Sequence, residues 1–141
     1  MGELVEGHWR TREQIIAADG RFSRPASKFR NWVTQDGSPG PSGEGGFPAE
    51  AGRYHLYVAM ACPWAHRTMI FRKLKKLEDI ISVSVVEPYM DEEGWAFSME
   101  LPDHIGGHAR LHQVYTAARP DYTGRVTVPV LWDKQRKTIV S

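Results

Sequence analysis

The stretch YHLYVAMACPWAHRTMIFRKL, residues 54–74, decides the fold of this 141-residue chain. Its first part alternates as a β-strand does, with Tyr54, Leu56 and Val58 on one face and Tyr57 and Ala59 on the other. Its second part has the spacing of a helix. The sequence therefore predicts a strand that turns directly into a helix.

The predicted helix runs from Pro63 to about Leu77, with Ile70, Leu74 and Leu77 on one apolar stripe. Basic side chains gather near its C-terminal end, where the helix dipole favours positive charge. Cys62, the single cysteine of the chain, stands immediately before the helix. The thiol is thus expected at a junction between strand and helix.

Later segments complete a βαβαββ order. IISVSVVEP (80–88) predicts a second strand, and ARLHQVYTAA (109–118) predicts a second helix. VPVLWD (128–133) and TIVS (138–141) predict a hairpin across KQRK. A parallel pair joined by a helix and followed by an antiparallel pair is the α/β, thioredoxin-like plan. The apolar stripe of the second helix consists of Leu111, Val114, Tyr115 and Ala118.

The position of Cys62 favours a reactive thiol over a small buried hydrophobe. The first N–H groups of a helix have no partner within it, and the dipole places partial positive charge there, so a thiolate is stabilised relative to a thiol. Pro63 suits the first helical position, which needs no N–H. A lone cysteine is most often only core material. The position of Cys62 between a strand and a helix that starts with proline makes a reactive thiol the favoured interpretation instead.

Ala65 stands where a dithiol oxidoreductase carries its second cysteine. Within these 141 residues, a mixed disulfide on Cys62 therefore has no second thiol to resolve it and must be released by an outside thiol. Glutathione is the obvious candidate. The sequence predicts monothiol chemistry.

Composition indicates one cytoplasmic globular domain. Eighteen basic and 17 acidic side chains leave a net charge of +1, which gives no field to recruit nucleic acid or a membrane surface. No apolar run has the length of a membrane span, and the N-terminus lacks a signal-peptide layout. A sheet that ends in mid-strand at Ser141 suggests a fragment of a longer protein.

Residues 1–50 are expected to form an N-terminal arm and linker, and residues 51–141 the thioredoxin-like domain. TREQIIAADG (11–20) predicts a short helix capped by Thr11. DGSPGPSGEGGFP (36–48) is rich in glycine, proline and serine and predicts a loop. The arm is therefore expected to lie over the domain rather than to contribute to its core.

Four motifs, in this order and at these spacings, resemble the glutathionyl-hydroquinone reductases, the Xi class of the glutathione transferase superfamily. The motifs are ACPWAHR (61–67), EEGWAF (92–97), YTGRVTVPVLWD (122–133) and TIVS (138–141). The resemblance implies an enzyme that reduces glutathionyl-hydroquinones to hydroquinones. It also implies glutathione as co-substrate, no metal, a homodimer when full length, and an all-helical C-terminal domain that would follow Ser141.

The same resemblance assigns the site. Cys62 is the implied nucleophile, Trp95 is implied to lie against glutathione, and the glutathione-binding edge is implied to be Arg125, Val126, Thr127 and Val128. A physical argument supports this edge: a cis proline is expected at Val128–Pro129, opposite the cysteine, where the exposed backbone can pair with an extended peptide. Val128, Val130 and Leu131 are expected to belong to a core strand as well, because a strand alternates faces.

Alternative functions remain open. An omega-type transferase or dehydroascorbate reductase also uses a single thiol, and a non-catalytic glutathione-binding module would have an ordinary, slow one. His104, His108 and His112 recur at every fourth position, but the glycines between them disfavour a metal site. The run 91–93 of acidic residues is expected to form a solvated tip rather than an acid–base pair.

Overall fold

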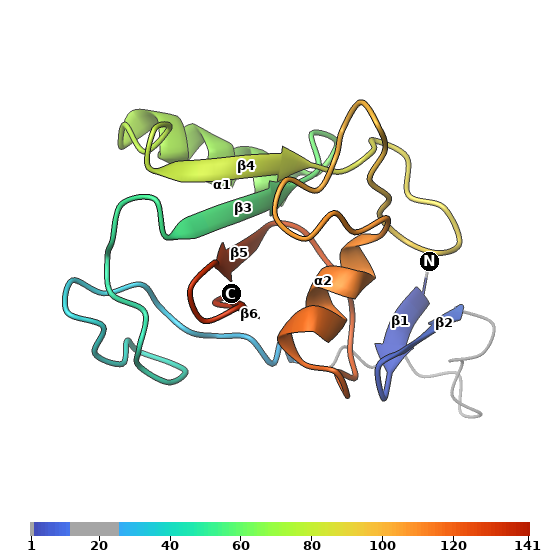
Figure 1. Ribbon diagram of the computed structural model, residues 1–141, viewed down its shortest axis with the longest axis horizontal. Coiled ribbons are helices and arrows are strands. Elements are labelled where there is room, and N and C mark those ends of the chain that lie inside the picture. Colours follow the sequence, from blue (N-terminus) through green and yellow to red (C-terminus); the bar gives the residue numbers. More distant parts are fainter. Residues whose placement is uncertain (1, 12–25) are drawn as a thin grey trace.

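The computed structural model describes residues 2–11 and 26–141. Among these residues, no helix is long and apolar enough to span a membrane. Figure 1 shows a small hairpin beside a mixed layer of strands and helices. In chain order the elements are β1 (Gly2–Val5), β2 (His8–Thr11), β3 (Tyr54–Val58), α1 (Pro63–Leu74), β4 (Ile81–Val85), α2 (Leu111–Ala118), β5 (Val130–Asp133) and β6 (Thr138–Ile139).

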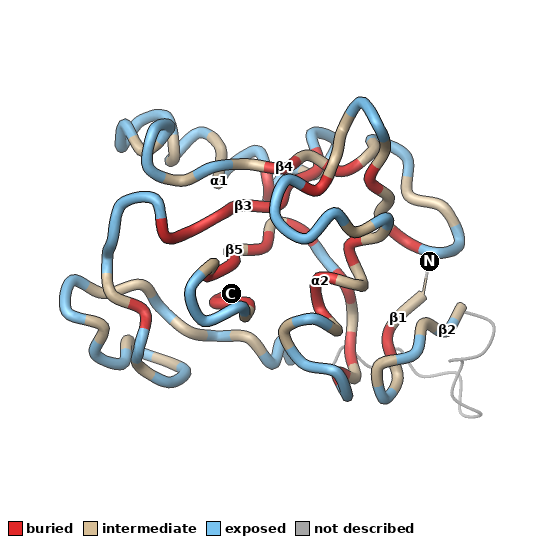
Figure 2. The backbone as a smooth tube through the Cα atoms, viewed as in Figure 1, coloured by how far each residue is buried: buried red, intermediate tan, exposed pale blue. Residues whose placement is uncertain are grey.

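The main sheet has four strands in the order β4-β3-β5-β6. β4 lies parallel to β3, while β5 is antiparallel to both β3 and β6. Every residue of β3 is buried, and Figure 2 shows the central strands as the most deeply buried part of the chain. The predicted thioredoxin-like α/β fold is confirmed, because the strand order and directions are those of that plan.

Helix α1 begins at Pro63 as predicted, but its buried face differs from the predicted one. Ile70 is 45% exposed and Leu74 is 70% exposed, whereas Ala65 is fully buried and Met69 packs against the core. Ala65 and Met69 are four residues apart and share a face. The prediction of the Ile70 stripe was wrong, because the helix turns the face with Ala65 and Met69 toward the core instead.

The N-terminal arm contributes directly to the core, contrary to expectation. Residues 2–11 form the β1–β2 hairpin, which the sequence pattern did not reveal. Leu4 is fully buried within the main hydrophobic cluster. Thr11 is the last residue of β2 rather than a helix cap, and residues 12–20 of the predicted helix lie outside the described residues. The domain boundary after residue 50 stays a prediction.

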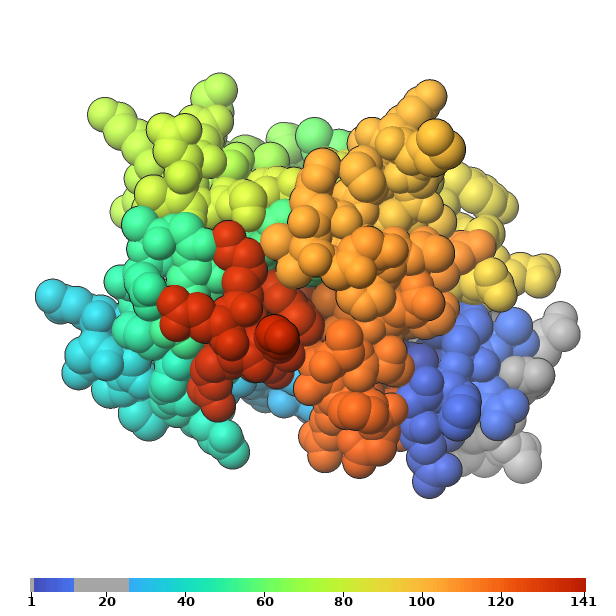
Figure 3. All heavy atoms as spheres, viewed as in Figure 1, coloured from blue at the N-terminus to red at the C-terminus, as the bar shows by residue number. Residues whose placement is uncertain are grey.

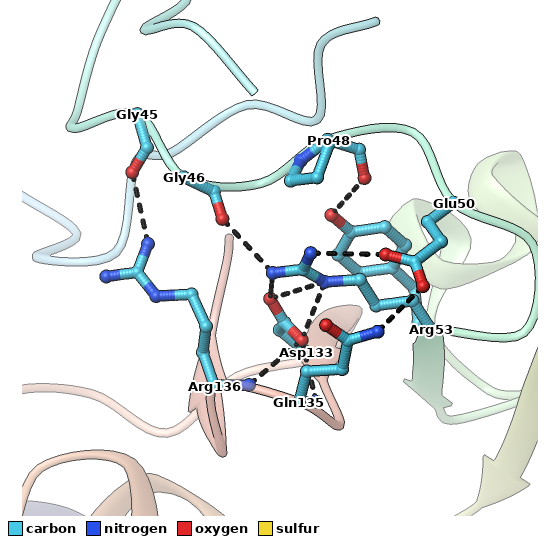
Figure 4. A network of polar contacts seen from close by, with 9 residues as sticks. Gly45, Gly46, Pro48, Glu50, Arg53, Asp133, Gln135 and Arg136 are labelled. Carbon is cyan, nitrogen blue, oxygen red and sulfur yellow. Dashed lines mark hydrogen bonds and ion pairs between the residues drawn. The ribbon is translucent and has the colours of Figure 1, made fainter. Parts of the chain in front are cut away.

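The loop 36–48 is anchored to the sheet by a buried ion pair (Figure 4). The Arg53 guanidinium donates to both carboxylate oxygens of Asp133, with a shortest N···O distance of 2.6 Å, and also to the carbonyl of Gly46. Burial by itself raises the pKa of Asp133. Hydrogen bonds from Arg53 and from the backbone N–H groups of Arg136 and Gln135 outweigh that effect, so the net pKa is lowered.

A second buried polar group, His55, lies in the middle of β3. Its Nδ1 is 2.7 Å from the Ser82 hydroxyl, and its Nε2 is 2.9 Å from the Ser84 hydroxyl; both serines come from β4. Burial lowers the pKa of His55 to about 4. The imidazole is therefore neutral in the folded protein at physiological pH and links two strands of the sheet.

We expect Asp133→Ala to lower the free energy of unfolding by about 3–5 kcal/mol, because it leaves the Arg53 cation buried without its anion. Urea unfolding at neutral pH measures the difference in the free energy of unfolding between the variant and the unsubstituted chain. The matched control is Asp121→Ala, which breaks the exposed Arg119–Asp121 pair and should cost less than about 1 kcal/mol. Equal losses in the two variants would contradict a special role for the buried pair.

We expect the stability of the fold to decrease between pH 6.5 and pH 4 because of His55. Its folded-state pKa is depressed, so the unfolded chain binds a proton more readily, and the stability present above pH 6.5 is lost as the pH falls. The loss is on the order of 3 kcal/mol, at about 1.4 kcal/mol per pH unit. Denaturant titrations across this pH range should show a flatter profile for His55→Gln. An unchanged profile in that variant would rule this contribution out.

Candidate functional site

Cys62 lies at the N-terminus of α1, as its N-cap residue. The residue has an extended backbone (φ −95°, ψ 119°), its N–H donates to the Ala59 carbonyl at 3.0 Å, and it is only partly buried. Its own carbonyl accepts the N–H of His66 at 2.9 Å and so starts the helix. The structure therefore places the thiol where the first open amides of the helix lie, as the sequence predicted.

The sulfur faces the backbone that leads into β5. The Cys62 thiol donates to the carbonyl oxygen of Val128, with an Sγ···O distance of 3.7 Å. The Val128–Pro129 peptide bond is cis, as predicted. The residue before the proline therefore presents its main chain directly to the sulfur.

One cavity of about 610 Å³ brings together all the residues predicted to form the site. Its lining includes Cys62, Trp95, Arg125, Val126, Thr127 and Val128. The predicted core packing of Val128, Val130 and Leu131 is confirmed, because the two valines belong to the core cluster and Leu131 packs against it. The roles of these residues toward glutathione stay predictions.

Tyr115 of α2 holds the edge formed by residues 125–128 through two hydrogen bonds to its main chain. The Tyr115 hydroxyl donates to the Thr127 carbonyl at 2.9 Å and accepts the Thr127 N–H at 3.3 Å. Burial raises the pKa of Tyr115, so the phenol stays protonated and keeps its donor. Since both main-chain groups of Thr127 are occupied, a peptide ligand would have to pair with its neighbours, as alternation along an extended strand allows.

Several lining residues were missed by the sequence reasoning. Tyr115 was assigned only to the core stripe of the second helix. Trp9 and Phe29 come from the arm, whose sequence has no sustained period to indicate a wall of the cavity. Phe29 stacks on Tyr122 at a ring distance of 5.4 Å and meets Tyr115 edge-on. The further lining residues are Gly2, Ser27, Trp64, Met90, Pro129, Ile139 and Ser141.

The cavity suits an extended, anionic thiol compound. Within the described part of the chain, the Arg125 guanidinium has no hydrogen bond or ion pair, so its charge is available to a ligand. Aromatic side chains provide apolar contact area, and the main chain at Val128 provides hydrogen bonds beside the sulfur. Such a site can bind a peptide-like thiol with its sulfur beside Cys62.

The histidines and carboxylates that raised alternatives have other partners. His108 pairs with Asp103 at 2.6 Å, and His112 stacks on Trp9 at 5.1 Å. Across residues 2–11 and 26–141, no three His, Cys, Asp or Glu side chains are grouped as metal ligands would be. The acidic turn at 91–93 pairs with Arg110.

Comparison with known proteins gives close relatives over the whole chain. The chain is 57% identical to the glutathionyl-hydroquinone reductase YqjG of Escherichia coli K12, covering 100% of this chain and 44% of that protein. It is 48% identical to the glutathionyl-hydroquinone reductase PcpF of Sphingobium chlorophenolicum, covering 100% of this chain and 43% of that protein. The resemblance predicted from the motifs is confirmed. The chain spans less than half the length of these relatives.

The glutathione-bound structure of YqjG from Escherichia coli K-12 superposes on this chain with a TM-score of 0.85 at 52% identity, covering 99% of this chain and 41% of that one. The family model described as the N-terminal domain of glutathione S-transferase matches residues 61–141. That range includes the thiol, Trp95 and the whole edge from Arg125 to Pro129. The chain belongs to the glutathione S-transferase N-terminal domain family.

Proposed function

We propose that this chain carries the thiol and the glutathione-binding edge of a glutathionyl-hydroquinone reductase. The observation that carries the proposal is the 3.7 Å contact between the Cys62 sulfur and the Val128 carbonyl, at the base of the cavity. The identity with YqjG and PcpF, both named glutathionyl-hydroquinone reductases, supports the substrate class.

In the proposed reaction, the Cys62 thiolate attacks the sulfur of a glutathionylated hydroquinone. The sulfur–carbon bond to the ring breaks, the ring carbon takes up a proton, and hydroquinone leaves a cysteine–glutathione disulfide behind. A second glutathione, as thiolate, attacks this disulfide and releases oxidised glutathione and the Cys62 thiolate. Overall, two sulfurs are oxidised to a disulfide and the ring carbon is reduced, so the electrons balance without a metal.

The structure supports the need for an external second thiol. Ala65, which occupies the position of a resolving cysteine, is fully buried, and Cys62 is the one cysteine among these 141 residues. Glutathione would be held by main-chain pairing at Val128, by the charge of Arg125 and by the indole of Trp95. The tripeptide serves as co-substrate in this scheme rather than as a resident cofactor.

We expect Cys62→Ser to reduce turnover of glutathionyl-menadiol by at least about a thousandfold, because the nucleophile is lost. The assay uses the protein as expressed from its own gene, with glutathione in excess. The matched control is Met99→Ser, which removes a sulfur from a fully exposed side chain and should leave turnover unchanged. Full activity of Cys62→Ser would overturn the proposal, and faster turnover of dehydroascorbate than of glutathionyl-menadiol would favour the omega-type alternative.

We also expect oxidised glutathione to form a stable mixed disulfide on Cys62. Intact-mass analysis should show one glutathionyl adduct, absent from Cys62→Ser, that persists in buffer because no internal thiol can release it. Addition of reduced glutathione should remove it. A thiol that forms this adduct no faster than free cysteine would point to the non-catalytic binding module.

A further inference from the structure

The β1–β2 hairpin is bonded to the segment that leads into the predicted glutathione edge. Leu4 and Gly124 exchange two main-chain hydrogen bonds, of 3.0 Å and 2.8 Å. The N–H of Glu6, in the turn of the hairpin, donates to the hydroxyl of Thr123 at 2.8 Å. Both partners directly precede Arg125, so one end of the hairpin holds the start of that edge.

The second strand of the hairpin holds the turn that leads into Trp95, through Trp9, the cross-strand partner of Leu4. The Trp9 indole N–H donates to the Glu92 carbonyl at 2.9 Å, and its ring stacks on His112 at 5.1 Å. Gly94 has a φ of +87°, and a Cβ there would be 2.9 Å from the Trp9 ring. The indole therefore fills the space above the turn, and only a glycine at position 94 leaves room for it.

A different contact holds the side chains of the same turn. Arg110, at the start of α2, pairs with Asp91 at 2.7 Å and with Glu93 at 3.0 Å. These pairs fix the carboxylates, which are partly or largely exposed. Trp9 instead donates to the main-chain carbonyl of Glu92, two residues before Gly94 and three before Trp95. The position of the Trp95 backbone thus depends on the hairpin as well as on α2.

Figure 3 shows the hairpin, in blue, packed against the orange segment that contains α2. Trp9 and Gly2 of the hairpin themselves line the cavity with Cys62. The match to the family domain starts at residue 61, so the hairpin lies outside the matched region. It lies before the family domain and contacts both the Trp95 turn and the segment that precedes Arg125.

We propose, on the basis of the function proposed above, that the β1–β2 hairpin sets the distance between Trp95 and the Arg125–Val128 edge, with Trp9 as its positioning residue. Trp95 and Arg125 lie on separate segments. Each segment is hydrogen-bonded to the hairpin within three residues before the named side chain. A tripeptide that contacts both Trp95 and Arg125 binds best when the distance between these two residues is fixed. The hairpin then governs affinity for the glutathionyl group, while Cys62 governs the chemistry.

The test uses S-methylglutathione, whose thioether cannot form a disulfide with Cys62. Calorimetric titration of the purified chain should show that Trp9→Phe, which lacks the indole N–H, binds it about fivefold to tenfold more weakly, as expected for one lost hydrogen bond. In the turnover assay, the KM of the same variant for the glutathionyl substrate should rise by a similar factor with kcat within about twofold. Alkylation of Cys62 by iodoacetamide should keep its rate.

The matched control is Trp32→Phe. Trp32 also donates its indole N–H, to the Ser42 hydroxyl at 3.0 Å, but it lies in the loop region and does not line the cavity. Its Kd and KM should match those of the unsubstituted chain. Thr123→Val, which removes the acceptor for Glu6 in the turn of the hairpin, should weaken binding as Trp9→Phe does, and it decides the question if Trp9→Phe does not fold.

Unchanged binding in both folded hairpin variants would overturn the proposal, as would a fall in kcat with no change in Kd. Weaker binding in Trp32→Phe by the same factor would overturn it too, because the effect would then be one of general stability. If the unsubstituted chain binds no S-methylglutathione, the proposed function itself fails, which is a separate and recognisable result.

Discussion

The antiparallel pairing of β3 with β5 is the constraint on which the site depends. Its register places Tyr57 opposite Val130, so the chain leaving β3 and the chain entering β5 meet at the same end of the sheet. The first carries Cys62 at the start of α1, and the second carries the cis bond before Pro129. The contact between thiol and carbonyl follows from this pairing rather than from any attraction between the two groups.

The opposite end of the same strand pair carries the buried ion pair. Tyr54 lies opposite Asp133, and Arg53, one residue before the strand, reaches back to the Asp133 carboxylate. His55 ties β3 to β4 through two serine hydroxyls in the next part of the sheet. Because β3 is buried on both faces, each polar group along it needs a partner within the protein. A shift in the register of β3 would break these pairings. They therefore stabilise the register that positions the thiol.

Around that frame the cavity is assembled from segments far apart in the sequence. The sulfur comes from the start of α1, the peptide-binding edge from the residues before β5, and the aromatic walls from the arm, the loop after β4 and α2. The family model covers the first two parts, whereas the named relatives match the whole chain, hairpin included. The hairpin lies outside the family model, and it contacts both the Trp95 turn and the segment before Arg125.

The sequence by itself determined the order of strands and helices from 54 to 141, the thiol at a helix N-terminus and the residues before the cis proline. Each of these has a local signal: alternation of period two, a proline at the first helical position, or a specific motif. It did not reveal the hairpin of residues 2–11, the covered face of α1, or the cavity walls from Trp9, Phe29 and Tyr115. These depend on which surfaces meet across long sequence separations. A short strand without sustained period, or a helix with apolar residues on more than one face, becomes defined only when tertiary packing selects its partner.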